Sequence, residues 1–211
     1  MTFAWLRTAA VVLLPAFAQD PGAGTRTPDF GAIDAYVARA MAADRVPGAS
    51  IAIVHGDTVV HVRGFGSDGR GNPVTGETGF VLGSMSKAFT ALAVMQLVER
   101  GRVELDAPAQ RYLPWFRVGD SAASAAITVR QLLLHTSGIP TRAARARGDA
   151  RTLTDHVRAL ASVKLAHAPG TVHEYASPNY LVLGAIVEAV ARRPFGAYVE
   201  QEIFAPLQME H

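Results

Sequence analysis

The first hydrophobic pattern along the chain predicts a helix followed by a β-hairpin. Apolar side chains recur every three or four positions, the spacing of one helix face, at Ile33, Tyr36, Val37, Ala40 and Met41. Pro47 and Gly48 end this helix. Residues 50–54 then form a short apolar strand, Gly56–Asp57 supplies a turn, and residues 58–63 return as a second strand.

A longer apolar segment, residues 84–100, contains no glycine or proline and is apolar on nearly every side of a helix. Its large apolar side chains are Phe89, Leu92, Val94, Met95, Leu97 and Val98. A helix of this kind is predicted to be buried all round, and Gly101 supplies its end. The glycine-rich residues 64–79 before it are predicted to form a loop.

Short helices and turns are predicted for the rest of the chain. The predicted helices cover residues 128–134, 153–164, 177–192 and 194–204. Thr128 and Gln131 have the spacing of a capping box, and Ser177 before Pro178 has the pattern of an N-cap followed by a first-turn proline. Residues 121–126 are predicted to be a surface loop. Helices around a few short strands indicate a mixed α/β (α+β) fold.

The composition is that of a globular protein, and it excludes several kinds of site. The 211 residues are 49% hydrophobic and 18% charged, with a formal net charge of +2. A basic cluster, which we interpret as a solvated surface and not as a nucleic-acid site, consists of Arg142, Arg145, Arg147 and Arg151. Because no cysteine is present, disulfides, thiolate zinc sites and cysteine nucleophiles are excluded.

Residues 1–18 have the pattern of a secretory signal peptide. Arg7 precedes an almost wholly apolar run, and Ala18 closes an Ala-x-Ala sequence. The run is shorter than the ~20 residues that span a bilayer. Residues 19–28 are interpreted as a linker and residues 29–211 as the folded domain. The mature product is therefore predicted to be exported, periplasmic or secreted, without a membrane span after signal removal. An uncleaved anchor or a disordered leader is the alternative.

Ser84 and Lys87 are the first candidates for chemistry. Three residues are almost one helical turn, so on a helix the Ser84 hydroxyl and the Lys87 amine project from the same face. A weak nucleophile then lies beside a nitrogen that can accept its proton. The start of a helix also favours negative charge developing there. The alternative is that Ser84 is a helix N-cap and Lys87 a surface cation.

Several other patterns for catalysis or cofactor binding are missing. His173–Glu174 lacks a second histidine at helical spacing, so a metalloprotease site is excluded. The chain has no Gly-x-Ser-x-Gly elbow, no Ser-Asp-Asn motif and no glycine loop of the nucleotide-binding kinds. We therefore expect neither a metal nor a cofactor. His55 and His61 flank the hairpin turn and are expected to be exposed.

Four segments carry motifs of a known family in the right order. They are residues 80–90, 105–114, 132–140 and 175–180. With these motifs the chain resembles the serine β-lactamase-related family, which includes class C β-lactamases, D-alanyl-D-alanine carboxypeptidases and related esterases. The resemblance implies a β-lactamase/transpeptidase-like fold, in which a helical region packs on an antiparallel sheet.

Carried over by motif, the resemblance also implies roles for individual residues. Ser84 would be the acylated nucleophile, Lys87 its proton acceptor and Tyr175 the second acid/base group. Ser177 stands where the family has asparagine in its Tyr-x-Asn motif, and its hydroxyl either contributes to substrate binding or only caps the following helix. His135 would have a structural role near a helix end.

The family's third motif, Lys- or His-x-Gly on a later strand, has no counterpart in this sequence. We therefore expect a partial domain, truncated before the C-terminal strands and unable to turn over substrate alone. The expected function is that of an exported serine hydrolase acting on an amide or ester carbonyl, with a small-molecule or peptidoglycan-type substrate. Lactam, D-Ala-D-Ala peptide and ester substrates stay open. The alternative is a truncated or non-catalytic member of the same fold that binds cell-wall fragments.

Overall fold

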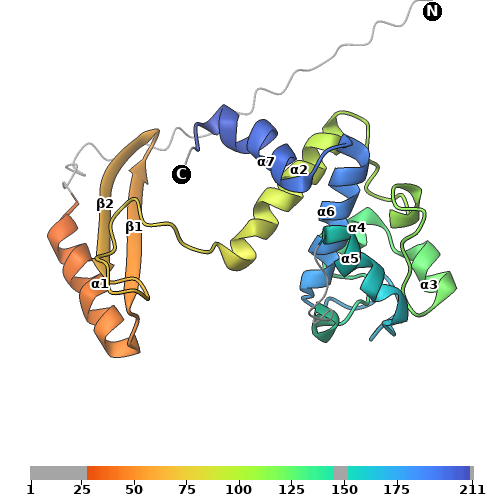
Figure 1. The fold of residues 1–211 in the computed structure, drawn as a ribbon, viewed down its shortest axis with the longest axis horizontal. Coiled ribbons are helices and arrows are strands. Elements are labelled where there is room, and N and C mark those ends of the chain that lie inside the picture. The colour runs from red at the N-terminus through yellow and green to blue at the C-terminus, as the bar shows by residue number, and fades with distance from the viewer. Residues whose placement is uncertain (1–27, 145–151, 210–211) are drawn as a thin grey trace, which may run out of the picture. The chain divides into compact units, whose positions relative to one another are not determined.

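The computed structural model describes residues 28–144 and 152–209, and Figure 1 shows its helices and strands. The chain divides into two compact units, residues 1–78 and residues 79–211, and each is described by itself. The predicted signal peptide, almost all of the predicted linker and most of the basic cluster lie outside the described residues. No helix among the described residues is long and apolar enough to cross a membrane.

The first unit consists of one helix and a two-stranded antiparallel sheet. Helix α1 (Phe30–Asp44) begins where the Asp29 carboxylate accepts a hydrogen bond from the backbone of the helix, and it ends before Arg45, whose φ is 55°. Strands β1 (Gly48–His55) and β2 (Thr58–Gly66) pair directly across the predicted turn. The predicted helix and hairpin are therefore confirmed, and both strands are longer than predicted.

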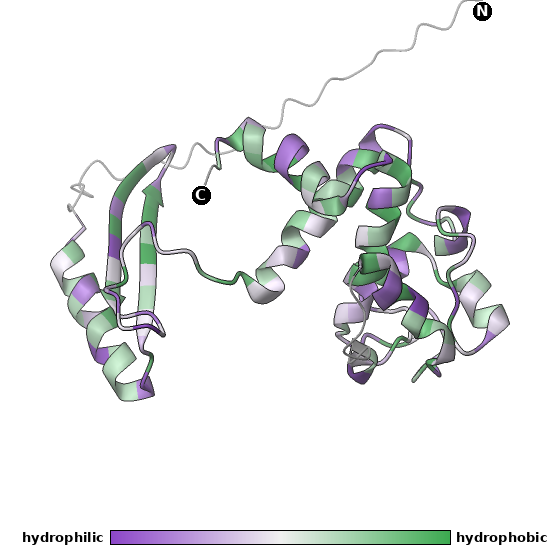
Figure 2. Ribbon diagram, in the orientation of Figure 1, coloured by the Kyte–Doolittle hydropathy of each residue, from purple (hydrophilic) through white to green (hydrophobic). Residues whose placement is uncertain are grey.

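Helix α1 is joined to β2 by a buried carboxylate. Asp34 lies 2.8 Å from Nε2 of His61 and accepts a hydrogen bond of 2.7 Å from Nη1 of Arg63. The Phe30 ring stacks on the His61 ring at 4.7 Å. The expectation that His61 is exposed is wrong, because its side chain retains only 17% of its accessible surface. Hydrophilic and hydrophobic residues alternate along β2 (Figure 2). The hydrophilic residues His61 and Arg63 bind Asp34 of α1.

The residues after β2 fold back over the hairpin. The backbone N–H of Val74 donates to the carbonyl of Gly66 at 3.0 Å, and the Val74 side chain is 6% exposed. This return requires glycine at position 64, because a Cβ there would lie 2.1 Å from the Val74 carbonyl oxygen. The predicted loop 64–79 is thus wrong at its start, where β2 continues.

We expect Gly64→Ala to destabilise the first unit by about 1–3 kcal/mol, the usual cost of forcing atoms into a filled space. Gly69→Ala is the matched control, because nothing lies within 4 Å of a Cβ built at Gly69. Its effect should stay within about 0.5 kcal/mol. Hydrogen exchange of the β2 amides in both variants measures the difference. Equal protection in the two variants would contradict the close approach.

The second unit is helical. Its α-helices are α2 (Ser86–Glu99), α3 (Ser121–Ala126), α4 (Val129–Leu133), α5 (Leu153–Arg158), α6 (Ser177–Ala191) and α7 (Phe195–Val199), and a π-helix, Glu200–Phe204, continues α7. Helix α6 is central, since α2, α4, α5 and α7 all contact it. The largest fully buried side chains include Leu97, Phe116, Leu132, Ile139, Leu183, Ile186 and Tyr198. The helices and the antiparallel pair together confirm the mixed α+β class.

Helix α2 differs from its prediction in two ways. It begins at Ser86, after a 3₁₀ turn over Gly83–Met85. It is also not buried all round: Val94 and Leu97 are completely buried, whereas Leu92 and Met95 are each 44% exposed. The reason is that α6, α7 and the π-helical residues Glu200–Phe204 contact α2 and leave part of its circumference uncovered. An apolar sequence alone does not show which sides are covered.

Two further predictions in this unit were partly wrong. Residues 121–126 form α3 instead of a loop, because the Asp120 carboxylate caps the alanine-rich segment through the Ala123 N–H at 2.6 Å. The helix predicted for residues 153–164 ends at Arg158 and continues as a 3₁₀ turn to Ser162. The capping box at the start of α4 is confirmed.

Candidate functional site

Ser84 lies in the 3₁₀ turn that leads into α2. The preceding Gly83 has a φ of 54°, a conformation that glycine adopts without strain. Lys87 follows in the first turn of α2 and is half-buried, whereas Ser84 is exposed. Ser84 is therefore accessible to solvent, whereas the Lys87 side chain packs partly against the protein.

The structure brings Ser84 and Lys87 together with the two predicted residues from the far end of the chain. The Ser84 Oγ lies 2.7 Å from the Tyr175 Oη. The Lys87 ammonium donates to the Ser84 Oγ at 3.3 Å and to the Ser177 Oγ at 3.2 Å. It also lies 4.9 Å from the centre of the Tyr175 ring. All four candidates thus form one connected group within the second unit.

The electrostatics of this group act mainly on Tyr175. Interaction with the Lys87 ammonium is the largest cause that lowers the pKa of the Tyr175 phenol, and the hydrogen bond with Ser84 lowers it further. A lowered pKa makes the phenolate accessible at a lower pH than for a free tyrosine. Tyr175 is therefore suited to accept a proton, and its oxygen lies closer to the Ser84 hydroxyl than the Lys87 nitrogen does.

Ser177 is not the N-cap of α6. The N-cap is Ala176, which has extended backbone angles, and no side-chain hydrogen bond caps the helix there. Ser177 is the first helical residue and Pro178 follows it. The hydroxyl of Ser177 instead accepts the hydrogen bond from Lys87. Of the two alternatives drawn from the sequence, the capping role is wrong and a polar contact in the site is observed.

A buried polar network lies behind these residues. The Ser137 hydroxyl donates to Oδ1 of Asn179 at 2.6 Å and accepts a hydrogen bond from the Ile139 N–H at 3.1 Å. Nδ2 of Asn179 lies 3.2 Å from Nδ1 of His135. Both Ser137 and Asn179 are completely buried. Buried polar groups are nearly always hydrogen-bonded, so the network stabilises the observed arrangement of the segments it joins.

His135 belongs to this network and not to the group around Ser84. Its Nδ1 accepts a hydrogen bond from the Ala176 N–H at 3.1 Å, and its ring centre lies 4.6 Å from that of Tyr175. Burial is the main cause that lowers the pKa of His135, and the positive charges of His173 and Lys87 lower it further. The geometry agrees with the structural role implied by the family resemblance.

Thr141 provides a second attachment for the segment that carries Tyr175. Its N–H donates to Oε1 of Glu174 at 3.1 Å, and its hydroxyl donates to the carbonyl oxygen of Tyr175. On the other side, the Glu174 N–H donates to the carbonyl oxygen of His135 at 2.9 Å. Roles for Thr141, Ser137 and Asn179 were not predicted from the sequence. Ser137 and Asn179 lie inside recognised motif segments, whereas Thr141 lies just outside one.

Among the described residues, no group of three or more histidine, aspartate or glutamate side chains could hold a metal ion. Glu174 lies 3.4 Å from Nε2 of His167, which is an ion-pair geometry on the surface. The residues around Ser84 consist of hydroxyls and one ammonium group, and this donor set is suited to proton transfer rather than to metal coordination.

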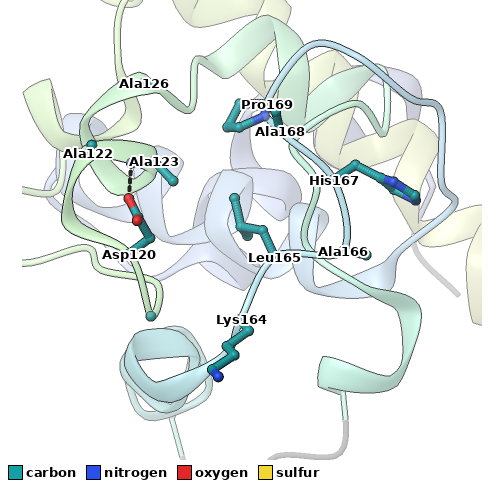
Figure 3. A pocket seen from close by; sticks show the side chains of 11 residues that line it. Asp120, Ala122, Ala123, Ala126, Lys164, Leu165, Ala166, His167, Ala168 and Pro169 are labelled. Carbon is teal, nitrogen blue, oxygen red and sulfur yellow. Dashed lines mark hydrogen bonds between the residues drawn. The ribbon is translucent and has the colours of Figure 1, made fainter.

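A hollow of about 720 Å³ lies elsewhere in the second unit, between α3 and residues 164–169. In Figure 3, Leu165 points toward the alanines of α3, whereas the His167 ring points away from them. Ala166, which lines the hollow, is bonded to the 132–140 segment: its N–H donates to the carbonyl oxygen of Gly138 at 2.9 Å. None of the four site residues lines this hollow.

Comparisons with known proteins agree with this fold. The family model described as Beta-lactamase matches residues 33–211. Penicillin-binding protein 4 of Amycolatopsis lactamdurans is 38% identical over 77% of this chain and 43% of its own length. Protein flp of Staphylococcus aureus (strain MW2) is 33% identical over 85% of this chain and 37% of its own length.

Among solved structures, a D-stereospecific amidohydrolase from Streptomyces sp. has 32% sequence identity and a TM-score of 0.71. The match covers 86% of this chain and 55% of that protein. The chain thus spans less than half the length of the two curated relatives and about half of this structure. The β-lactamase/transpeptidase-like fold expected from the motifs is confirmed by these matches.

Proposed function

The chain belongs to the Beta-lactamase family, and from this premise we propose that it is an exported serine hydrolase that forms an acyl-enzyme on Ser84. The observation that carries the proposal is the position of one serine hydroxyl between two groups able to take its proton. The Ser84 Oγ lies 2.7 Å from the Tyr175 Oη and 3.3 Å from the Lys87 Nζ. The Tyr175 distance is within the ~2.6–3.2 Å reach for direct proton transfer, and the Lys87 distance lies just outside it.

In the proposed reaction, Tyr175 starts as a phenolate stabilised by the Lys87 ammonium. The Ser84 oxygen attacks the carbonyl carbon of an amide or ester while its proton passes to this phenolate. The tetrahedral intermediate then collapses, the bond to the leaving amine or alkoxide breaks, and the same proton is returned to the leaving group. A water molecule then attacks the acyl carbon while its proton passes to the Tyr175 phenolate. The bond to the Ser84 oxygen breaks, and Tyr175 returns the proton to Ser84 as the acid is released. Ser177 holds the Lys87 ammonium through its hydroxyl and contributes a polar contact to the bound substrate.

The substrate class proposed is a small acyl donor of the lactam, D-amino-acid peptide or ester type. Support comes from similar proteins, which include a penicillin-binding protein and a D-stereospecific amidohydrolase. Both exceed the present chain in length, so their activities enter here as proposals. A non-catalytic protein that binds cell-wall fragments is the second candidate, and it would bind such ligands without forming an adduct.

Export is part of the proposal and rests on the N-terminal pattern ending at Ala18. We expect secreted or periplasmic material to begin at Gln19. N-terminal sequencing of the exported protein measures this directly. Recovery of membrane-bound material that retains Met1 would contradict it and favour an anchor.

The experiment that tests the chemistry is covalent labelling followed by peptide mapping. The chain is incubated with a fluorescent penicillin or a p-nitrophenyl ester, and its intact mass is recorded. One acyl group per chain, located on the peptide that contains Ser84, is the expected result. Single-turnover labelling is preferred to a turnover assay because it reports formation of the acyl-enzyme alone. Saturable binding without a mass increase would favour the non-catalytic candidate.

A further inference from the structure

Two of the four site residues lie on a short non-helical segment, and one buried backbone group holds that segment in place. Tyr175 and Ser177 flank Ala176, which is completely buried. The N–H of Ala176 donates to Nδ1 of His135 at 3.1 Å. A buried N–H that lost this acceptor would remain unsatisfied at a cost of about 1–3 kcal/mol.

The His135 ring is itself held from several directions. Its centre lies 4.6 Å from the Tyr175 ring and 5.1 Å from the Tyr180 ring. Its backbone has a φ of 56°, and its carbonyl oxygen accepts the hydrogen bond from the Glu174 N–H. The ring therefore cannot turn away from Ala176 without disturbing the residues on both sides of it.

Two donors converge on the same ring nitrogen. Besides the Ala176 N–H at 3.1 Å, Nδ2 of Asn179 lies 3.2 Å from Nδ1 of His135. Oδ1 of Asn179 accepts from the Ser137 hydroxyl, which makes Nδ2 the amide atom that faces His135. A nitrogen that receives two hydrogen bonds must present a lone pair, so His135 is neutral with its proton on Nε2.

We propose that His135 is a positioning residue for the reaction at Ser84, and that its protonation in acid releases the segment carrying Tyr175 and Ser177. The proposal rests on the function proposed above. A proton on Nδ1 would place a third donor against the N–H groups of Ala176 and Asn179. The segment would then shift, and a displacement of about 1 Å in a reacting group can cost about 10²-fold in rate.

The groups that face His135 favour this behaviour. His173, whose ring centre lies 6.0 Å away, and Lys87 contribute positive charge, and together with burial they lower the pKa of His135. The Tyr175 and Tyr180 rings also face His135, and the nearby Glu174 carboxylate lies in ion-pair geometry with His167. The unfolded chain, with a histidine pKa of about 6.5, binds this proton more readily than the folded chain. Stability therefore falls as the pH decreases below about 6.5 toward the lowered pKa.

The variant that tests the proposal is His135→Asn. Asparagine places Oδ1 where histidine has Nδ1, accepts the Ala176 N–H at every pH, and tolerates the positive φ. The rate of Ser84 labelling is measured between about pH 5 and pH 8 in both proteins, a range that spans the ordinary histidine pKa. We expect the wild-type rate to fall by about an extra tenfold per pH unit in the acidic part of this range, as one additional protonation requires. The additional fall should be absent in H135N.

His173→Asn is the matched control, since it removes a neighbouring imidazole that does not bond to Ala176. The extra acidic fall should persist in this variant, moved to a higher pH because the His173 charge no longer lowers the pKa of His135. Asn179→Asp is a third arm: a carboxylate facing His135 would raise the pKa of the imidazole and move the fall to a higher pH. Identical pH profiles in wild type and H135N would overturn the proposal.

A nitrogen NMR spectrum separates this proposal from the function on which it rests. At about pH 8, above the ordinary histidine pKa, Nδ1 of His135 should be unprotonated and Nε2 protonated. If no reagent labels wild-type Ser84 at any pH, the proposed function fails, and the spectrum still tests the geometry. A proton on Nδ1 at this pH would overturn the role of His135 whatever the labelling shows.

Discussion

Replacing Ser84 with alanine is expected to abolish labelling by a fluorescent penicillin or a p-nitrophenyl ester. The oxygen that would carry the acyl group is removed, and no other serine in the sequence has a lysine three residues later. The rate should fall by about 10⁴-fold or more, the scale seen when a nucleophile is deleted. Because Ser84 is exposed, the fold should be unaffected. Intact-mass spectrometry measures the label, and circular dichroism measures the fold.

Ser86→Ala is the matched control for this prediction. Ser86 is also exposed, lies two residues further along, and begins α2. Labelling of S86A should remain within a few-fold of wild type, since its side chain makes no contact with Lys87 or Tyr175 among the hydrogen bonds of the site. A label that remains in S84A and maps to another serine would refute the assignment of the nucleophile.

The parts of the fold that the sequence predicted well are those encoded by local signals. The apolar face of α1, the turn between β1 and β2, and the capping box at Thr128 each depend on a few neighbouring residues. The proline at the second position of α6 marks the start of that helix in the same local way. Such signals are readable because they do not depend on what packs against the element.

The errors arise where the outcome depends on distant residues. The exposed side chains Leu92 and Met95 of α2 could not be recognised, because burial depends on how much of the helix α6 and α7 cover. His61 was expected at the surface, but Asp34, on a different element, draws it into a buried pair. Neither partner could be inferred from the pattern of its own segment.

The site shows the same division. Spacing and motif identified Ser84, Lys87, Tyr175 and Ser177, and the structure brings these four together, although their roles stay predictions. The choice between a capping and a contact role for Ser177 required the position of Lys87, 90 residues earlier. Asn179 lies in the recognised 175–180 segment, but its role was not predicted, because the local pattern does not show which residues it bonds to. Its importance lies in the bonds that it makes to Ser137 and His135.

The second large effect is expected for Tyr175→Phe. The variant keeps the ring that packs against His135 and Lys87 but loses the oxygen 2.7 Å from the Ser84 hydroxyl. The acylation rate should decrease by about 10²–10⁴-fold, the usual contribution of a general acid or base. Lys87, at 3.3 Å, remains available and accounts for residual labelling. Single-turnover labelling of the variant and the wild type measures the ratio.

The pH dependence identifies the group that was lost. The lowered pKa of Tyr175 means that the wild-type rate should increase with pH as the phenol ionises, and should level off below the pH expected for a free tyrosine. Phenylalanine cannot ionise, so this increase should disappear in Y175F. Tyr180→Phe is the matched control: it loses only the hydrogen bond to the Leu133 carbonyl at 3.1 Å and should keep the wild-type profile. If Y175F retains the increase with pH, the proton leaves Ser84 for Lys87 and not for Tyr175.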